Sequence, residues 1–128
     1  MVPHDKQSQI AAVEAFLAGL TRNDVRAMPF ADDVLLTSPL DPGNPARGRD
    51  QVIAFLQNEV FPKVPVASAK VERHIVEGDA VATLWEATFH LDGKAVVVPI
   101  FDFFRVTGGL IHEIRPYFDP KPLKGRAG

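Results

Sequence analysis

The sequence of 128 residues contains no cysteine, so disulfides, thiolate metal sites and cysteine nucleophiles are excluded. It has no charge excess: 14 basic residues against 16 acidic ones leave a net charge of −2, which provides no basic surface for nucleic acid. The longest apolar run, from Ala95 to Phe101, is too short to cross a bilayer, and the N-terminal residues lack the apolar stretch of a signal peptide. We therefore expect a cytoplasmic protein that binds neither nucleic acid nor a membrane.

The composition is typical of one globular domain. Apolar residues make up 46% of the chain and charged residues 23%, and the length is sufficient for a hydrophobic core. We expect a single domain over residues 1–128, with a flexible basic tail at 120–128. Many of the eleven prolines and nine glycines lie between residues 39 and 48, which indicates a long shaped loop.

Hydrophobic periodicity predicts helices first and strands afterwards. The helices are expected at residues 6–20, at a short segment ending at Met28, and at 49–61, with a short strand at 34–37. Four strands are expected in the second half, over residues 67–77, 80–91, 94–107 and 109–118. Turns containing glycine separate these strands, as in antiparallel hairpins. This order predicts an α+β fold in which a curved sheet encloses a pocket.

Asp102 is the most informative residue because it lies in a strand that is apolar on both faces. Such a strand is covered on both faces, so its side chains leave bulk water. A buried carboxyl group either finds a partner or stays protonated. Asp102 is therefore the first candidate for chemistry, and the alternative is a structural carboxylate held by a neighbouring donor.

Several stretches, in this order, resemble the ketosteroid isomerase and SnoaL-like branch of the NTF2-like superfamily: Phe16 to Asp24, Phe30 to Asp33, Arg47-Gly48, Asp92-Gly93, Pro99 to Val106 and Gly109 to Asp119. The resemblance covers the chain from about Val13 to Asp119. It implies the NTF2-like cone, a curved and mostly antiparallel sheet wrapped around three N-terminal helices. It also implies a homodimer formed through the outer face of the sheet.

The resemblance assigns roles to individual positions. Ketosteroid isomerase uses an aspartate base and an oxyanion hole made of a tyrosine and a neutral aspartic acid. Asp102 matches the neutral acid, which donates a hydrogen bond to a ligand oxygen. The tyrosine position holds Phe16, which cannot donate. The base position holds Ser38, a poor base at neutral pH. Asp41 is the candidate base if its loop folds inward, and a solvated turn aspartate is the alternative.

Alternation along the strands predicts the lining of the pocket. The inward side chains, grouped with Asp102, are Trp85, Ala87, Phe89, Ile100, Phe104, Ile114, Pro116 and Phe118. Phe16, Met28, Ser38 and Phe55 are expected to complete the lining and its mouth. Such a lining suits a flat hydrophobic ligand that carries a carbonyl or hydroxyl group. The alternative is that these aromatic side chains fill the interior.

The histidines do not have the spacing of metal ligands. His74, His90 and His112 lie on different predicted strands, so we expect neither a metal nor another cofactor. His112 is kept as a minor pocket candidate beside Ile114.

The opposite face of the predicted sheet is also apolar. It carries Val97, Phe101, Phe103, Ile111 and Tyr117, with Arg105, Glu113 and Arg115 among them. An apolar outer face is costly to leave in water, which indicates a partner there.

Three functions remain open. The first, implied by the resemblance, is proton transfer next to a carbonyl group of a small hydrophobic substrate, of the isomerase or cyclase type. The second is a non-catalytic binding protein for an apolar small molecule. The third is a dimerising structural module. Epoxide hydrolysis by an Asp-Arg-Asp arrangement is disfavoured, because Ile100 occupies the position where the arginine is needed.

Overall fold

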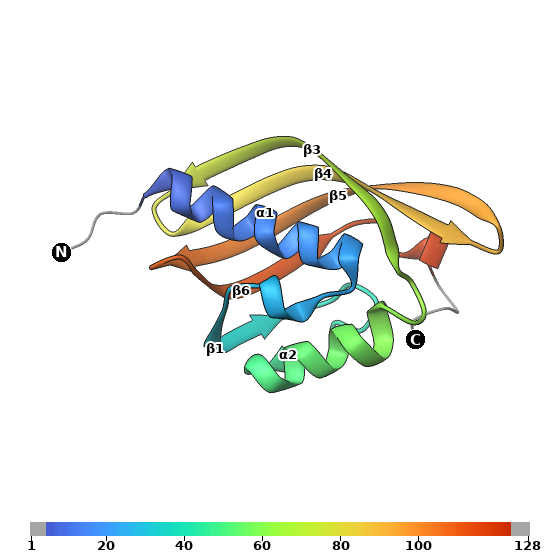
Figure 1. The fold of residues 1–128 in the computed structure, drawn as a ribbon, viewed down its shortest axis with the longest axis horizontal. Coiled ribbons are helices and arrows are strands. Elements are labelled where there is room, and N and C mark those ends of the chain that lie inside the picture. The colour runs from blue at the N-terminus through green and yellow to red at the C-terminus, as the bar shows by residue number, and fades with distance from the viewer. Residues whose placement is uncertain (1–4, 124–128) are drawn as a thin grey trace.

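The structure, a computed structural model, describes residues 5–123 and is built on one six-stranded sheet with the strand order β2-β1-β6-β5-β4-β3. The strands are β1 (Phe30–Leu36), β2 (Ala46–Arg47), β3 (Val66–Glu77), β4 (Ala80–Leu91), β5 (Lys94–Thr107) and β6 (Leu110–Tyr117). Strands β3 to β6 form an antiparallel meander, and β1 joins β6 in parallel. Figure 1 shows the curved sheet with α1 (Lys6–Arg22) across one face. The predicted mixture of helices with a curved, mostly antiparallel sheet is confirmed.

Helix α1 follows directly from its sequence. Asp5 caps its first turn by accepting a hydrogen bond from the Gln7 backbone N–H at 3.0 Å. Its apolar residues recur at helical spacing, and Phe16 and Leu20 are among those buried against the sheet. The helix ends at Asn23, which adopts a left-handed conformation with a φ of 53°.

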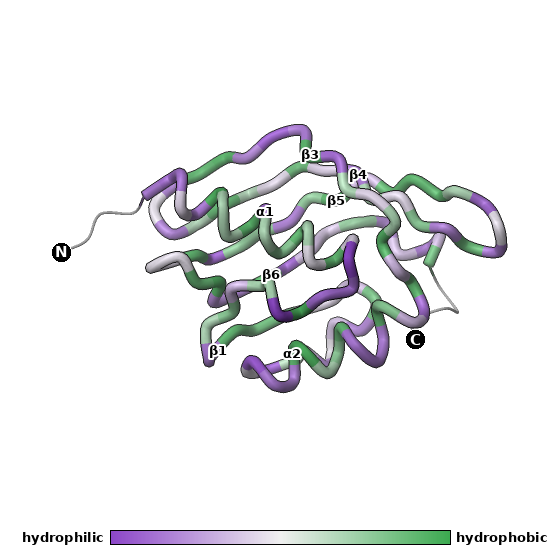
Figure 2. Tube along the Cα trace, viewed as in Figure 1, coloured by the Kyte–Doolittle hydropathy of each residue, from purple (hydrophilic) through white to green (hydrophobic). Residues whose placement is uncertain are grey.

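The expectation of three N-terminal helices is only partly correct. The second is a three-residue 3₁₀ turn, η1 (Val25–Ala27). Pro29 explains its brevity, because the residue before a proline is disfavoured in the helical conformation. The third begins as α2 (Arg49–Phe55) and continues as a π-helical turn, η2 (Leu56–Val60). Figure 2 shows that α2 alternates between hydrophilic and hydrophobic residues, as expected for a helix that lies on the surface.

Strand β1 starts earlier than expected. The predicted strand covered residues 34–37, whereas β1 begins at Phe30. Asp32 and Asp33 suggested a turn, but they lie inside the strand as exposed residues. The pairing of β1 with β6 is irregular between Phe30 and Leu35, which explains why simple alternation did not reveal the strand.

A β-bulge in β6 changes which residues face inward. Arg105 pairs with Glu113 while the next residue, Val106, pairs with Ile111, so His112 is the extra residue. Ile111 is therefore buried in the core, although alternation placed it on the outer face. His112 in turn lies away from the pocket, although alternation placed it beside Ile114.

Part of the segment predicted as a basic tail has secondary structure. Residues Lys121–Leu123 form a 3₁₀ turn, η3, and the Leu123 side chain is only 2% exposed. The rest of the predicted tail, residues 124–128, lies outside the described residues. None of the helices within residues 5–123 combines the length and the apolar character that a membrane span requires.

Candidate functional site

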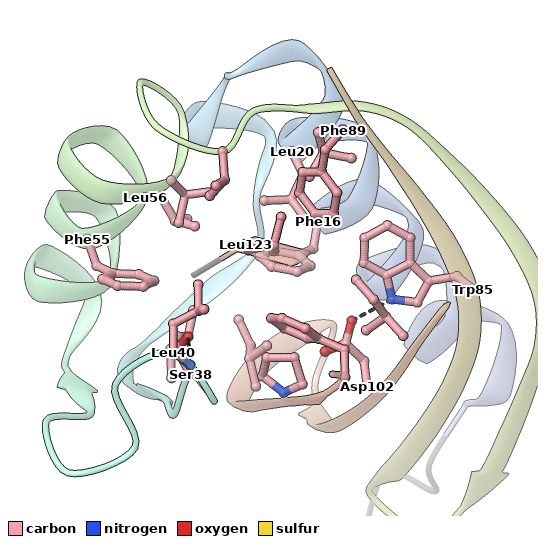
Figure 3. A pocket seen from close by; sticks show the side chains of 18 residues that line it. Phe16, Leu20, Ser38, Leu40, Phe55, Leu56, Trp85, Phe89, Asp102 and Leu123 are labelled. Atoms are coloured by element: carbon pink, nitrogen blue, oxygen red, sulfur yellow. Dashed lines mark hydrogen bonds between the residues drawn. The ribbon is translucent and has the colours of Figure 1, made fainter. Parts of the chain in front are cut away.

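The inner face of the sheet encloses a cavity of about 100 Å³ beneath α1, α2 and the loop after β1. Ten residues predicted for the pocket line it: Phe16, Ser38, Phe55, Trp85, Phe89, Ile100, Asp102, Ile114, Pro116 and Phe118. Figure 3 shows Trp85 and Asp102 on the sheet side, with Ser38, Leu40 and Phe55 across the cavity. Strand alternation therefore located most of the wall.

The aliphatic part of the lining was missed. It consists of Leu20, Leu36, Leu40, Leu56, Val60, Val64, Val66 and Leu123. Most of these residues come from helix turns and loops, where the period-two pattern carries no information. Leu20 could have been found, because it follows Phe16 by one helical turn on the same face of α1.

Three residues predicted for the pocket or its mouth are buried elsewhere. Ala87 and Phe104 are fully buried but do not reach the cavity. Phe104 packs edge-on against Phe16, with ring centroids 5.8 Å apart, and so lies in the core under α1. Met28 lies against Gly19 of α1, at a place where even a Cβ atom on Gly19 would come within 2.9 Å of its side chain. These residues support the cavity from outside.

Asp102 is the only titratable side chain among the described residues that line the cavity. It is 2% exposed, and its Oδ2 accepts a hydrogen bond of 2.7 Å from Trp85 Nε1. Its other oxygen, Oδ1, has no hydrogen-bond partner within residues 5–123. Burial raises the pKa of the Asp102 carboxyl to about 7, and the hydrogen bond from Trp85 partly opposes this rise. The site therefore holds a carboxyl group that changes protonation near neutral pH.

The register of the sheet explains the contact between Trp85 and Asp102. Asp102 pairs directly with Thr83 on β4, and Trp85 is the next inward residue along that strand. Diagonal neighbours of this kind are within reach of a long aromatic side chain. This donor was not foreseen, since identifying it required the register as well as the inward face.

Ser38 is the second polar residue of the lining. Its Oγ accepts a hydrogen bond of 3.1 Å from the Leu40 backbone N–H, and its carbonyl oxygen accepts one from the Asp41 N–H, also at 3.1 Å. These bonds hold the start of the loop in a tight turn. No acceptor for the hydroxyl hydrogen of Ser38 occurs among the described residues, so this hydrogen is available to a ligand.

Asp41 does not reach the cavity. It is exposed, and both its carboxylate oxygens accept hydrogen bonds from Asn44 Nδ2, at 3.1 and 3.3 Å. The turn at Ser38 points Asp41 to the solvent, although Leu40 of the same loop lines the cavity. The arrangement thus corresponds to the alternative of a turn aspartate, and Asp41 is not among the residues that line the cavity.

Two of the described histidines form hydrogen bonds outside the cavity. His74 lies between Glu14 and Thr83, and His112 lies between Asp33 and Thr107. His90 is exposed on β4. Within residues 5–123, histidine and acidic side chains do not gather in threes as a metal site would require.

Comparison with known proteins identifies relatives at the level of family and fold. The family model of the SnoaL-like domain matches residues 13–114. No curated protein matches the chain.

Solved structures resemble the chain over nearly its full length. A hypothetical protein with a ketosteroid isomerase-like fold from Catenulispora acidiphila, in complex with trimethylamine, has a TM-score of 0.76 and 21% identity, covering 91% of this chain and 92% of that one. An LEH-like epoxide hydrolase from M. tuberculosis has a TM-score of 0.76 and 24% identity, covering 94% and 90%. A candidate SnoaL-like polyketide cyclase from Jannaschia sp. CCS1 has a TM-score of 0.77 and 19% identity, covering 99% and 97%. At these identities the likeness shows the fold alone.

Proposed function

Because this chain belongs to the SnoaL-like domain family, we propose that it binds a small apolar molecule in the cavity and holds one polar atom of that molecule at Asp102. The main support for this proposal is Asp102 Oδ1, which has no hydrogen-bond partner among the described residues. It is buried in a cavity wall that is otherwise almost entirely apolar. A buried polar atom without a partner is costly, and a ligand atom would remove that cost. The preferred ligand carries a carbonyl or hydroxyl oxygen, which accepts a hydrogen bond from the protonated acid.

The size of the cavity limits the ligand. A cavity of about 150 Å³ holds benzene in another protein, and the cavity here measures about 100 Å³. A ring of five or six atoms fits if the side chains at its edge shift slightly. A larger molecule, such as a steroid or a polyketide, requires side chains of the lining to move apart. We therefore expect the ligand to be a small cyclic or short-chain molecule.

Catalysis is the second candidate, favoured by the pKa of about 7 for Asp102. A general acid or base works best when its pKa lies near the working pH. A single carboxyl group can take a proton from the carbon next to a carbonyl and return it to another carbon. Phe16 supplies no second hydrogen-bond donor, and Asp41 supplies no second carboxylate. The chemistry that fits is a proton shift carried by Asp102 alone.

Two other ligand classes follow from the similar structures. Epoxide hydrolysis fits poorly, because no arginine lines the cavity within the described residues and Ile100 stands where one would be needed. A small amine fits better. An alkylammonium group would donate to ionised Asp102 and place its methyl groups against the aromatic walls. The trimethylamine bound to the Catenulispora protein is a probe for this class.

Binding of cyclopent-2-enone, a five-membered ring with one carbonyl oxygen, tests the proposal. Titrations followed by NMR would compare the native protein with Asp102→Leu, Asp102→Asn and the control Asp41→Asn. We expect Asp102→Leu to weaken binding about three- to tenfold, the range of one neutral hydrogen bond. Asp102→Asn retains binding, because its amide can donate to the carbonyl oxygen. Unchanged affinity in Asp102→Leu would refute the proposal.

The same samples separate binding from catalysis. In D₂O, a catalytic site exchanges the hydrogens next to the carbonyl group for deuterium, and NMR follows this exchange directly. We expect Asp102→Asn to bind the enone but to lose the exchange, since an amide does not transfer protons at neutral pH. Exchange no faster than in buffer, with binding intact in the native protein, selects the non-catalytic binding protein.

A further inference from the structure

Glu14, His74 and Thr83 form a series of contacts that leads from the surface of α1 to the buried strand pair that carries Asp102. Glu14 on α1 is 56% exposed, and its Oε2 lies 3.1 Å from His74 Nε2 on β3. His74 Nδ1 lies 2.8 Å from the hydroxyl oxygen of Thr83 on β4. The His74 side chain is 11% exposed and Thr83 is fully buried, so this series of contacts passes from solvent into the core.

Thr83 is the cross-strand partner of Asp102. The two residues pair directly between β4 and β5, and both face the inside of the sheet. Directly opposite residues have Cβ atoms about 4.5–5.5 Å apart. The Thr83 hydroxyl and Asp102 Oδ1 are not hydrogen-bonded in the structure. A proton transfer between them requires a rotation of one of the two side chains or a bridging water.

We propose that Glu14, His74 and Thr83 form a proton route between Asp102 and the solvent. In the tautomer that carries its hydrogen on Nε2, His74 would donate to Glu14 and accept from the Thr83 hydroxyl at Nδ1. This orientation leaves the lone pairs of the Thr83 oxygen free to accept from the acid form of Asp102.

Each step of the transfer is balanced. The O–H bond of Asp102 breaks as one forms on Thr83 Oγ1, and the original hydroxyl hydrogen of Thr83 moves to His74 Nδ1. The hydrogen on His74 Nε2 moves to Glu14, which releases it to water. Asp102 is then ionised, Thr83 is unchanged, and His74 is neutral in its other tautomer. Uptake of a proton runs the same steps in reverse and restores the first tautomer.

The route matters because Asp102 is the only titratable side chain in the described lining of the cavity. A bound apolar ligand would also exclude water from this cavity. The groups that face the His74 ring are the Glu14 carboxylate from α1 and the Thr83 hydroxyl from β4. Thr83, His74 and Glu14 act through Asp102, so they are positioning and relay residues. Their use in turnover rests on the proposed function, whereas proton exchange at Asp102 can be measured in the ligand-free protein.

The experiment measures how fast Asp102 exchanges its proton in the ligand-free protein. Trp85 is the single tryptophan and donates directly to Asp102, so its indole ¹⁵N signal reports the protonation state. Relaxation dispersion of this signal at a pH near 7 gives the exchange rate on the μs–ms timescale. A pH titration of the same signal gives the midpoint separately, so that a change in rate is not confused with a change in pKa.

We expect Thr83→Val and His74→Gln each to slow the exchange by about fivefold or more, the factor that corresponds to the loss of one net hydrogen bond. Glu14→Gln, on the surface, is expected to slow it as well and remains informative if Thr83→Val does not fold. Thr107→Val and His112→Gln are matched controls, because they alter a similar threonine–histidine–aspartate set with 2.8 Å contacts away from the cavity.

A native exchange rate in either Thr83→Val or His74→Gln overturns the proposal, since the proton then leaves through the cavity itself. An equal slowing in the two control variants overturns it too, because the effect is then a general loss of rigidity. Both results are independent of the enone titration: the route can fail while Asp102 still binds a ligand, and binding can fail while the route operates.

Discussion

The Trp85 indole donates a hydrogen bond of 2.7 Å to Asp102 Oδ2 inside the sheet, and Trp85 is the only tryptophan of the chain. A change in the charge of Asp102 therefore changes the environment of the Trp85 indole. Burial raises the pKa of Asp102 to about 7, whereas the pKa of an exposed aspartate lies near 4. The fluorescence of Trp85 should thus report the protonation state of Asp102.

The first prediction concerns this signal. The emission of Trp85 is expected to change with pH in one step with a midpoint of about 7. In Asp102→Asn the amide cannot ionise, and the step is expected to disappear. Asp41→Asn serves as the control and should retain it, since Asp41 is exposed and lies outside the cavity. A step near pH 7 that survives in Asp102→Asn would assign the titration to another group.

The second prediction concerns stability. Asp102 has a pKa of 3.8 in the unfolded chain and about 7 in the folded protein. Between these values the folded state binds more protons, so the free energy of unfolding falls as the pH rises from about 4 to about 7. The difference of about 3 pKa units corresponds to about 4 kcal/mol. Asp102 thus contributes most to stability below pH 4 and loses that contribution by pH 7.

Asp102→Asn isolates this effect, because the other carboxyl groups titrate equally in both proteins. Urea unfolding at pH 4.5 and pH 8 would give the free energy of unfolding of each. Relative to the native protein, the variant is expected to gain stability on going to pH 8. A constant difference between the two proteins across this range would mean that Asp102 is not held in an apolar environment.

Much of the site could be predicted, because many of its residues lie on strands whose side chains alternate between the two faces of the sheet. The inward residues of β4 and β5, among them Trp85, Ile100 and Asp102, follow from the period of two and from the apolar character of both strands. The hairpin turns fix the pairing of β4 with β5, and hence the position of Asp102 in the sheet. These are local properties of the sequence.

The errors come from features that break local periodicity. The bulge at His112 reverses the alternation in β6, so Ile111 moved to the core and His112 to the outer side. The turn at Ser38 points Asp41 to the solvent, a result that depends on a side-chain hydrogen bond to Leu40. Leu123 reaches the cavity through a 3₁₀ turn that no repeat predicts. Non-local packing decides each of these cases.

The third prediction distinguishes the two ligand classes by the sign of their pH dependence. A carbonyl ligand binds more tightly to protonated Asp102. Its apparent Kd is expected to be constant below pH 7 and to rise above it, as the competent fraction falls. Trimethylammonium requires ionised Asp102, so its Kd is expected to fall as the pH rises toward 7 and then to level. Calorimetric titrations of both probes between pH 5.5 and 8.5 give these slopes.

For either ligand, Asp102→Asn is expected to remove the pH dependence. The variant retains a hydrogen-bond donor for the carbonyl oxygen but has no negative charge for the amine. Enone affinity should therefore persist in this variant, while amine affinity is lost. If neither ligand shows a slope in the native protein, its polar atom does not bind at Asp102.

The fourth prediction concerns the outer face of the sheet, where we propose that two copies of the chain associate. Val97, Phe101 and Tyr117 are 55%, 42% and 52% exposed, and Phe101 pairs directly with Tyr117 across β5 and β6. Beside them, Glu113 lies between two arginines at 3.2 and 2.7 Å, which neutralises its charge. An apolar surface of this kind is expected to be covered.

Sedimentation velocity is expected to give twice the mass of one chain for the native protein, and one chain mass for Phe101→Glu. The substituted carboxylate would face its own copy across a two-fold axis and leave water on association, which is unfavourable for a buried charge. Lys70→Glu, on the exposed face of the edge strand β3, is the matched control and should remain dimeric. Because Phe101 points away from the cavity, the pH step of Trp85 should persist in the monomer. A native protein that sediments as one chain at high micromolar concentration contradicts the dimer.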